Sequence, residues 1–145
     1  MDNTDDGSGV PEVSPLEANE ILQSDNRAVL LDVRSKMEFD YVGHPVGALN
    51  VPWQSPPKWQ LNPDFLEDVR RELKSRAANQ RPEDMVVLAM CRSGKRSLDA
   101  ATYLKESGFQ KVINIGDGFE GGLDNNKHRG NLAGWRFHDL PWEQT

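Results

Sequence analysis

Two short apolar runs constrain the fold of this chain more than any other feature. Residues 28–33 (AVLLDV) and 85–90 (MVVLAM) contain one polar residue between them and are rich in branched side chains. Such runs are typical of strands that are buried on both faces of a parallel sheet. Parallel neighbours need crossover connections, which helices commonly provide. The runs therefore predict an α/β fold with a parallel sheet and helices on both faces.

Helix signals surround these runs. Capping boxes that begin at Ser14 and Ser35 predict one helix to about Gln23 and a short helix that Gly43 ends. Brief strands are expected at 48–51 and 112–115, and the proline-rich segment 53–59 (WQSPPKW) is expected to be an irregular loop.

Two further helices are expected in the second half of the chain. Asn62 is the predicted cap of a helix that continues to about Ala78, with proline at its first position. Another helix should begin at about Ser97 and end at Gly108, which is expected to be a left-handed cap.

Length and composition fit one soluble domain. The chain has 145 residues, and none of its segments approaches the roughly 18 consecutive apolar residues of a membrane span. Residues 1–12 are acidic and contain glycine and proline, so we expect a disordered tail before a domain at 13–145. They lack the features of a secretory signal, and a lone cysteine suits a reducing compartment, so we expect a cytoplasmic protein without a membrane partner. The net charge of -6 argues against a nucleic-acid partner.

The only cysteine, Cys91, directly follows the second apolar run. Ligands of open parallel sheets bind at the carboxyl ends of strands, where this cysteine must lie. The amides of the following helix attract anions, Gly94 lets the loop curl, and Arg92, Lys95 and Arg96 add positive charge. Cysteines at helix N-termini beside Lys or Arg are favoured as thiolates. The sequence thus predicts a reactive nucleophile, although a lone cysteine is more often a small buried apolar residue.

Other charged residues are interpreted as structural. Glu38 already has a capping role and Arg34 is a candidate partner for it, so neither these residues nor Asp32 are assigned to catalysis. The histidines are not spaced as a metal site, and one cysteine makes a zinc cluster implausible. These histidines are His44, His128 and His138.

The four tryptophans lie in irregular segments. Trp135 and Trp142 are expected to pin loops to the core, which is the common role of tryptophan near proline and glycine. For Trp53 and Trp59, packing and a binding platform both remain open.

Three segments resemble single-domain rhodaneses, a family of sulfurtransferases. LLDVRSKMEFDYVGHPVGALNVP is similar to the opening segment of the family, CRSGKRS to its active-site loop, and VINIGDGFEGGLDNNKHRG with GWRFHDLPW to the closing segment of many bacterial members. The resemblance covers about residues 13–143. It implies a rhodanese-like three-layer sandwich with a mostly parallel central sheet and helices on both faces. An irregular C-terminal extension is expected from about residue 116.

The resemblance also implies a chemistry. Cys91 would take a sulfane sulfur from a small anionic donor such as thiosulfate, release sulfite and become a persulfide, which a thiol or cyanide acceptor then discharges. Backbone amides would cradle the persulfide and the basic side chains would hold the donor. The substrate-binding residues implied are Arg92, Ser93, Gly94, Lys95 and Arg96. No metal or organic cofactor is implied, and a protein could be the donor or acceptor.

Two alternatives remain open at this stage. A sulfur carrier or regulatory module that docks a protein partner could retain the same cysteine, although rhodanese-like modules without catalysis often lack it. Phosphatases of rhodanese-like fold, and arsenate reductases, are the less favoured enzymes. The phosphatase loop is one residue longer than the segment between Cys91 and Arg96, and at that longer spacing this chain has Ser97, which cannot make the bidentate phosphate contact of arginine.

Overall fold

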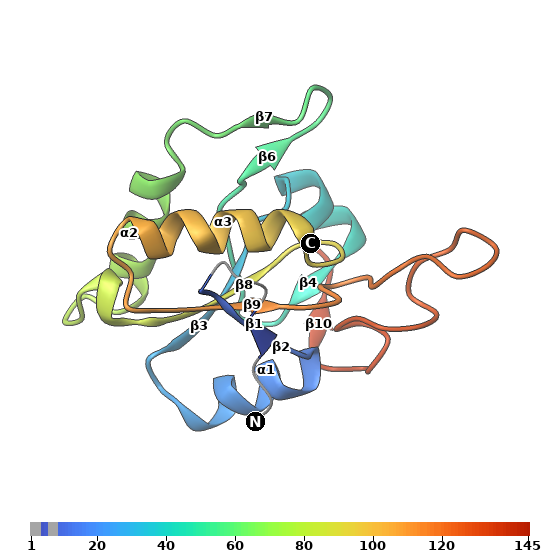
Figure 1. The fold of residues 1–145 in the computed structure, drawn as a ribbon, viewed down its shortest axis with the longest axis horizontal. Helices are drawn as coiled ribbons and strands as arrows, with labels where there is room; N and C mark the ends of the chain where they lie inside the picture. The colour runs from blue at the N-terminus through green and yellow to red at the C-terminus, as the bar shows by residue number, and fades with distance from the viewer. Residues whose placement is uncertain (1–3, 6–8) are drawn as a thin grey trace.

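The computed structural model describes residues 4–5 and 9–145. Its centre is a six-stranded sheet with the strand order β1-β2-β9-β8-β3-β5 (Figure 1). The β1–β2 pair is antiparallel, and the other four neighbouring pairs are parallel. The strands are β1 (Thr4–Asp5), β2 (Pro11–Val13), β9 (Lys111–Ile115), β8 (Val86–Met90), β3 (Ala28–Asp32) and β5 (Leu49–Asn50).

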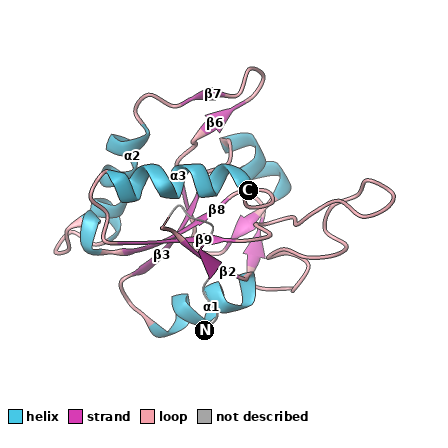
Figure 2. Ribbon diagram, in the orientation of Figure 1, coloured by secondary structure: helices cyan, strands magenta, loops and turns pink. Residues whose placement is uncertain are grey.

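Helices cover both faces of this sheet, as predicted (Figure 2). Helix α1 (Pro15–Ser24) lies on one face, and α2 (Phe65–Arg76) and α3 (Lys95–Glu106) lie on the other. Successive residues of a strand point to opposite faces, so β3 contributes to two cores. Leu31 packs in the core of α2 and α3, whereas Leu30 packs in the core of α1. The α/β three-layer sandwich is confirmed.

The two apolar runs form adjacent central strands. In the β3–β8 pair, Ala28 lies opposite Val86 and Asp32 lies opposite Met90. The carboxyl ends of both strands are therefore level, one residue before Cys91. This edge of the sheet is where the sequence predicted a binding site.

The N-terminal prediction requires a correction. Val10 is buried, and Pro11–Val13 forms β2, in which Glu12 lies opposite Asn114 of β9. The predicted tail was therefore wrong for residues 10–12, because composition does not reveal that a neighbouring strand satisfies their backbone. Thr4–Asp5 form β1 at the edge of the sheet. Residues 1–3 and 6–8 of that tail lie outside the described residues.

Helix boundaries follow local capping with two shifts. The Ser14 capping box of α1 is confirmed, and Ser14 Oγ accepts from the amide of Glu17 at 3.1 Å. Helix α2 begins at Phe65, because Asn62 Oδ1 accepts from the amide of Asp64 in a turn that precedes the helix. It ends at Arg76, slightly before the predicted end.

Helix α3 begins earlier than predicted, at Lys95, so its first turn contains two of the three basic residues of the cysteine loop, Lys95 and Arg96. Its end is as expected: Gly108 is left-handed with φ 103°, and the amide of Phe109 donates to the carbonyl of Leu104 at 3.1 Å. No helix within residues 4–5 and 9–145 has the length and apolar character to cross a membrane.

Two short segments differ in kind from the prediction. The capping box at Ser35 is present, but the short helix after it, η1 (Glu38–Val42), is a π-helix. The segment expected to be an irregular loop forms a hairpin of β6 (Gln54–Ser55) and β7 (Gln60–Leu61). Both prolines lie in the turn of this hairpin, where they remove no ladder hydrogen bond. A 3-10 helix, η2 (Pro82–Asp84), precedes β8.

The C-terminal extension forms loops at one end of the sheet (Figure 1). It ends in β10 (Trp142–Glu143), which pairs with β4 (His44–Pro45) and was not predicted. Trp135 is buried, and its Nε1 donates to the carbonyl of Pro141 at 2.9 Å. Trp142 packs edge-on against Phe119, so both tryptophans pin the extension as predicted.

Candidate active site

The thiol of Cys91 lies at the junction of β8 and the loop that starts α3. Its Sγ accepts a hydrogen bond from the backbone amide of Gly94 at 3.1 Å. Gly94 has φ 110°, a left-handed conformation that favours glycine, and this conformation turns the amide toward the sulfur. The first turn of α3 adds amides that have no partner within the helix. Backbone N–H groups are therefore gathered around the sulfur, as in anion-binding loops.

Cys91 is 1% exposed, yet it lines a cavity of about 300 Å³. Cys91 is thus buried in the core, as a lone cysteine commonly is, and its side chain is also accessible from one side through the cavity. The residues that line the cavity are Gln54, Trp59, Cys91, Arg92, Ser93, Lys95, Arg96 and Asp99. All predicted site residues except Gly94 belong to this set, and Gly94 contacts the sulfur from the loop backbone.

A buried polar network supports the loop from below. Ser97 Oγ lies 3.3 Å from Cys91 Sγ and 2.6 Å from Asn114 Oδ1. Asn114 Nδ2 donates to the carbonyl of Gly94 at 3.1 Å and to a carboxylate oxygen of Glu12 at 3.3 Å. Ser97 and Asn114 are fully buried. The network ties Cys91, the left-handed Gly94 and strands β9 and β2 together.

This network was not predicted from the sequence. Ser97 belongs to the recognised loop motif, but its contact with the sulfur depends on its position in the first turn of α3. Asn114 lies in β9 as the one polar residue among its buried positions, and a polar residue in a buried strand is the signal that could have identified it.

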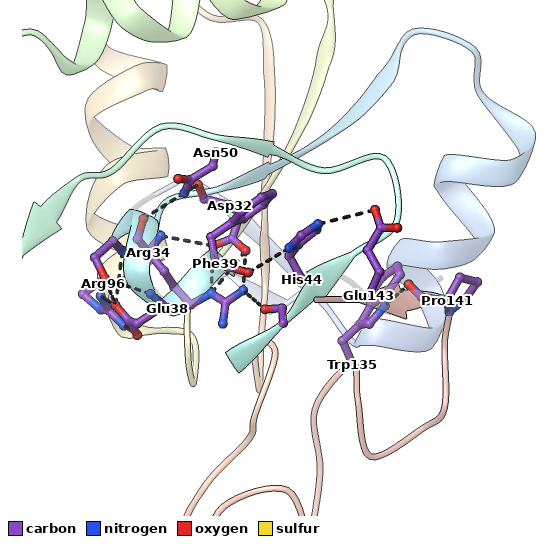
Figure 3. Close-up of polar contacts among 12 residues, drawn as sticks. Asp32, Arg34, Glu38, Phe39, His44, Asn50, Arg96, Trp135, Pro141 and Glu143 are labelled. Atoms are coloured by element: carbon purple, nitrogen blue, oxygen red, sulfur yellow. Dashed lines mark hydrogen bonds and ion pairs between the residues drawn. The ribbon is translucent and has the colours of Figure 1, made fainter. Parts of the chain in front are cut away.

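The three basic residues of the loop have different surroundings. Arg96 makes two hydrogen bonds to the carboxylate of Glu38, at 2.9 and 2.8 Å (Figure 3). Arg92 and Lys95 are exposed, and neither makes an ion pair with another described residue. Arg96 therefore braces the loop against η1, which leaves Arg92 and Lys95 as the cations available to an anion.

The Glu38–Arg96 ion pair shifts the pKa of both partners. Burial raises the pKa of Glu38, but the hydrogen bonds and charge of Arg96, with hydrogen bonds from Ser35, hold its pKa below the usual value. Burial lowers the pKa of Arg96, and Glu38 outweighs this effect, so that the pKa of Arg96 is raised. Both groups remain charged at neutral pH.

Arg34 does not pair with Glu38, its candidate partner in the sequence, because it binds Asp32. The Nη2 atom of Arg34 lies 2.6 Å from Asp32 Oδ2 and 2.6 Å from the carbonyl of Gly43, and both side chains of the ion pair are fully buried (Figure 3). The guanidinium stacks on Phe119 at 4.7 Å from the ring centroid. This pair lies at the end of β3 beside the cysteine strand and is structural, as the sequence analysis proposed.

His44 is likewise part of the scaffold. Its Nδ1 lies 2.8 Å from the carbonyl oxygen of Phe39, and its ring stacks on the Phe39 ring at 3.6 Å. Its Nε2 lies 3.4 Å from a carboxylate oxygen of Glu143 in β10 (Figure 3). These contacts join η1, β4 and β10 next to the site.

Trp59 forms part of the cavity rim. The β6–β7 hairpin carries it to the cavity, and the Arg96 guanidinium lies 5.0 Å from its ring centroid. Trp53, the other tryptophan that the sequence left open, packs against Phe65 with ring centroids 4.9 Å apart. Packing therefore holds for Trp53, whereas Trp59 is 43% exposed beside the cysteine loop.

The fold and the cysteine loop together define an α/β domain of the rhodanese type. The family model for the Rhodanese-like domain matches residues 14–125, and the chain belongs to this family. This family membership confirms the resemblance that the three sequence segments indicated.

Several proteins are similar to the chain over most of its length. It is 32% identical over 136 residues to uncharacterized protein RC0915 of Rickettsia conorii, an alignment that covers 92% of this chain and 98% of the relative. It is 30% identical over 110 residues to thiosulfate sulfurtransferase GlpE of Haemophilus influenzae, covering 76% of this chain and 85% of that protein. Family members with a sulfurtransferase name are thus related to it at modest identity.

Solved structures agree with this assignment. The crystal structure of Rv0390 from M. tuberculosis has a TM-score of 0.78 and 37% identity, and the match covers 92% of this chain and 97% of that chain. The human single-domain sulfurtransferase TSTD1 has a TM-score of 0.57 and 26% identity, with 77% and 93% coverage.

Proposed function

We propose that this protein is a sulfurtransferase that carries a sulfane sulfur on Cys91 as a persulfide. The observation that carries the proposal is the position of the Cys91 sulfur, which contacts the amide of Gly94 at 3.1 Å and lines an open cavity. Backbone amides that favour a thiolate also favour the negative charge of a persulfide. Family membership and the sulfurtransferase names of relatives support the same chemistry.

The reaction has two steps in this proposal. The Cys91 thiolate attacks the outer sulfur of a donor such as thiosulfate, the S–S bond of the donor breaks, and sulfite leaves with the bonding electron pair. Cyanide or a thiolate then attacks the terminal sulfur of the persulfide, which returns Cys91 as a thiolate. No oxidant, metal or organic cofactor enters either step.

The loop supplies both the charge and the position that the first step requires. Arg92 and Lys95 attract the anionic donor, since both are exposed on the cavity rim. Arg96 was also expected to bind the donor, and we assign it instead to holding the loop through Glu38. We place the reaction in the cytoplasm, because a reducing compartment keeps a lone thiol in its free form.

The phosphatase alternative is disfavoured by the same ion pair. A phosphatase loop uses its arginine for two hydrogen bonds to the phosphate. In this loop Arg96 already makes two hydrogen bonds to Glu38. A phosphoryl group would have to displace that carboxylate before it could bind.

Mass spectrometry of the intact protein tests the proposal. Incubation with thiosulfate should add about 32 Da for one sulfur atom, and subsequent cyanide should remove it and produce thiocyanate. Cys91→Ser is the control, because Cys91 is the only cysteine. An unchanged mass with thiosulfate, with mercaptopyruvate and with a protein persulfide would contradict the proposal. A stable persulfide without turnover of small acceptors would instead identify a sulfur carrier for a protein partner.

A further inference from the structure

Glu12 of β2 is an exposed residue whose carboxylate reaches the buried network behind the cysteine loop. It lies opposite Asn114 of β9, so the two side chains share one face of the sheet. Its Oε1 accepts from Asn114 Nδ2 at 3.3 Å. Glu12 does not line the cavity beside Cys91, and the proposed reaction gives it no contact with a substrate. Any effect of Glu12 on the site must therefore pass through Asn114.

The acceptors around Asn114 fix the direction of its side-chain amide. The carbonyl of Gly94 lies 3.1 Å from Nδ2 and the carboxylate of Glu12 lies 3.3 Å from it, and both groups only accept. The Nδ2 end must therefore face them, which leaves Oδ1 to accept from the Ser97 hydroxyl at 2.6 Å. A reversed amide would place Oδ1 against a carboxylate without a proton between the two acceptors. Because a hydrogen bond to a charged group is stronger than a neutral one, Glu12 strengthens the observed orientation.

Asn114 in turn holds the residue whose amide contacts the sulfur. Gly94 presents its carbonyl to Asn114 Nδ2 and its amide to Cys91 Sγ, each at 3.1 Å. The carbonyl also accepts from the amide of Leu98 at 3.3 Å and from the Ser97 hydroxyl at 3.2 Å, and both of these donors belong to α3. Asn114 donates from β9, so it ties the left-handed glycine to the sheet. A change at the Asn114 amide therefore reaches the residue that faces the sulfur.

Gly116 makes room for the contact between Glu12 and Asn114. A Cβ atom at position 116 would lie 2.8 Å from both Cδ and Oε2 of Glu12 and 3.0 Å from its Cγ. The Glu12 side chain thus crosses directly over the backbone of Gly116, closer than a side chain at this position would permit. Gly116 does not have a left-handed φ, so its backbone conformation does not require glycine. Close approach of the carboxylate explains the glycine instead.

We infer that Glu12 is a positioning residue for sulfur transfer by Cys91. Its carboxylate holds the Asn114 amide, Asn114 holds the carbonyl of Gly94, and the amide of Gly94 is thereby directed at the sulfur that takes up and releases the transferred atom. Glu12 acts through these residues and not on the reacting atoms. The inference rests on the proposed persulfide chemistry and adds to it a residue from the N-terminal strand, outside the cysteine loop.

A double-mutant cycle tests the inference. Glu12→Ala removes the carboxylate, and Gly116→Ala displaces it, because the new methyl group would occupy the space of its end. We expect each variant to lower kcat/KM for thiosulfate by about 3- to 10-fold, the effect of losing one hydrogen bond. When Glu12→Ala is already present, Gly116→Ala should cause no further fall, because the atoms that it displaces are absent. Glu20→Ala removes an exposed carboxylate from α1 and should leave kcat/KM unchanged.

Nuclear magnetic resonance provides a readout that does not depend on activity. In nitrogen–proton correlation spectra, Glu12→Ala and Gly116→Ala should shift the same two signals, those of the Gly94 backbone amide and the Asn114 side-chain amide. Glu20→Ala should shift neither signal.

The outcomes distinguish this inference from the proposed function. Unchanged Gly94 and Asn114 signals in Glu12→Ala overturn the positioning role, and so do falls in kcat/KM that multiply in the double variant. Shifted signals with an unchanged kcat/KM also overturn it, because the contact would then serve the fold alone. In each of these cases, thiocyanate formation that depends on Cys91 preserves the sulfurtransferase. If the wild type forms no persulfide with any donor, the proposed function fails and the positioning role fails with it.

Discussion

Two Asp-x-Arg segments of this chain have the same local structure and opposite surroundings. In Asp25-x-Arg27 and in Asp32-x-Arg34, the Arg amide and Nε both donate to Oδ1 of the aspartate, and Nη2 donates to Oδ2. The first pair is exposed on the surface turn before β3, whereas the second is fully buried at the end of β3. The same local hydrogen bonds therefore operate in water in one case and in the protein interior in the other.

The comparison teaches that burial decides the energetic role of a charge. Exposed ion pairs contribute little to stability, but removal of one partner from a buried pair leaves an uncompensated charge. The site contains a graded series: the buried Asp32–Arg34 pair, the half-buried Glu38–Arg96 pair, and the unpaired exposed Arg92 and Lys95. The inner charges support the scaffold, and in the proposed function the outer ones attract the donor.

The largest expected effect is that of Asp32→Asn. It should lower the free energy of unfolding by about 4 kcal/mol, because the guanidinium of Arg34 stays buried without a charged partner. Asp25→Asn is the matched control and should leave the midpoint of urea unfolding almost unchanged. Circular dichroism during urea denaturation measures both. Equal losses in the two variants would refute the burial argument.

Glu38→Gln should have an intermediate effect on stability. At neutral pH we expect a loss of about 2 kcal/mol, between the values for exposed and buried pairs. The pKa of Glu38 lies below its ordinary value of 4.5, so its ion pair stabilises the fold above that value and is lost as the pH falls through the lowered pKa.

The unfolding free energies of wild type and Glu38→Gln should therefore converge at acidic pH. Urea denaturation of wild type and Glu38→Gln between about pH 7 and pH 3, which brackets the ordinary pKa of a glutamate carboxyl, checks this convergence. Asp40→Asn removes the exposed Lys36–Asp40 pair and serves as the control. A difference between wild type and Glu38→Gln that is constant over this range would argue against the ion pair.

Ser97→Ala tests how much a buried uncharged hydroxyl contributes to the site, in comparison with the ion pairs. It leaves Asn114 Oδ1 without its 2.6 Å contact and removes a hydroxyl 3.3 Å from the Cys91 sulfur. We expect kcat/KM with thiosulfate to fall about tenfold, the effect of losing one buried hydrogen bond. Ser107→Ala at the opposite end of α3 is the control. A fall of equal size in both variants would indicate a general effect on α3.

The smallest effects are expected at the exposed cations. Lys95→Gln or Arg92→Gln should lower kcat/KM with thiosulfate by about 2- to 5-fold, since one exposed charge steers an anion weakly. The reduction should shrink as potassium chloride is added, because salt screens exposed charges. Lys111→Gln serves as the control, because Lys111 is exposed at the first position of β9, the end of the strand away from the cysteine loop. A reduction that is independent of salt would point to a direct contact rather than steering.

The elements that local signals define were predicted well. The runs at β3 and β8, the cap at Ser14 and the turn at Gly108 depend on residues close in sequence, and all appear in the structure. Two of the errors concern strands whose partners are distant in sequence. Strand β2 depends on β9, and β10 depends on β4, and neither partner is visible from composition.

The predictions for the site divide in the same way, between features set by neighbouring residues and features set by distant ones. The cysteine, its place after a strand and the basic loop could be predicted, because all lie within one short segment. The contacts of Glu38 and Asn114 with the loop, and the place of Trp59 at the cavity, could not, since each residue belongs to a different element that tertiary packing brings to the loop.

By itself the sequence determined an α/β sheet and a cysteine at the carboxyl end of one strand, because hydrophobic period and chain order are local properties. Only the tertiary structure decided which of the loop cations is paired and which is available, and that an aromatic side chain lies beside the thiol. Burial and ion pairing depend on distant segments that meet after folding. The charge series around Cys91 is therefore a property of the folded domain.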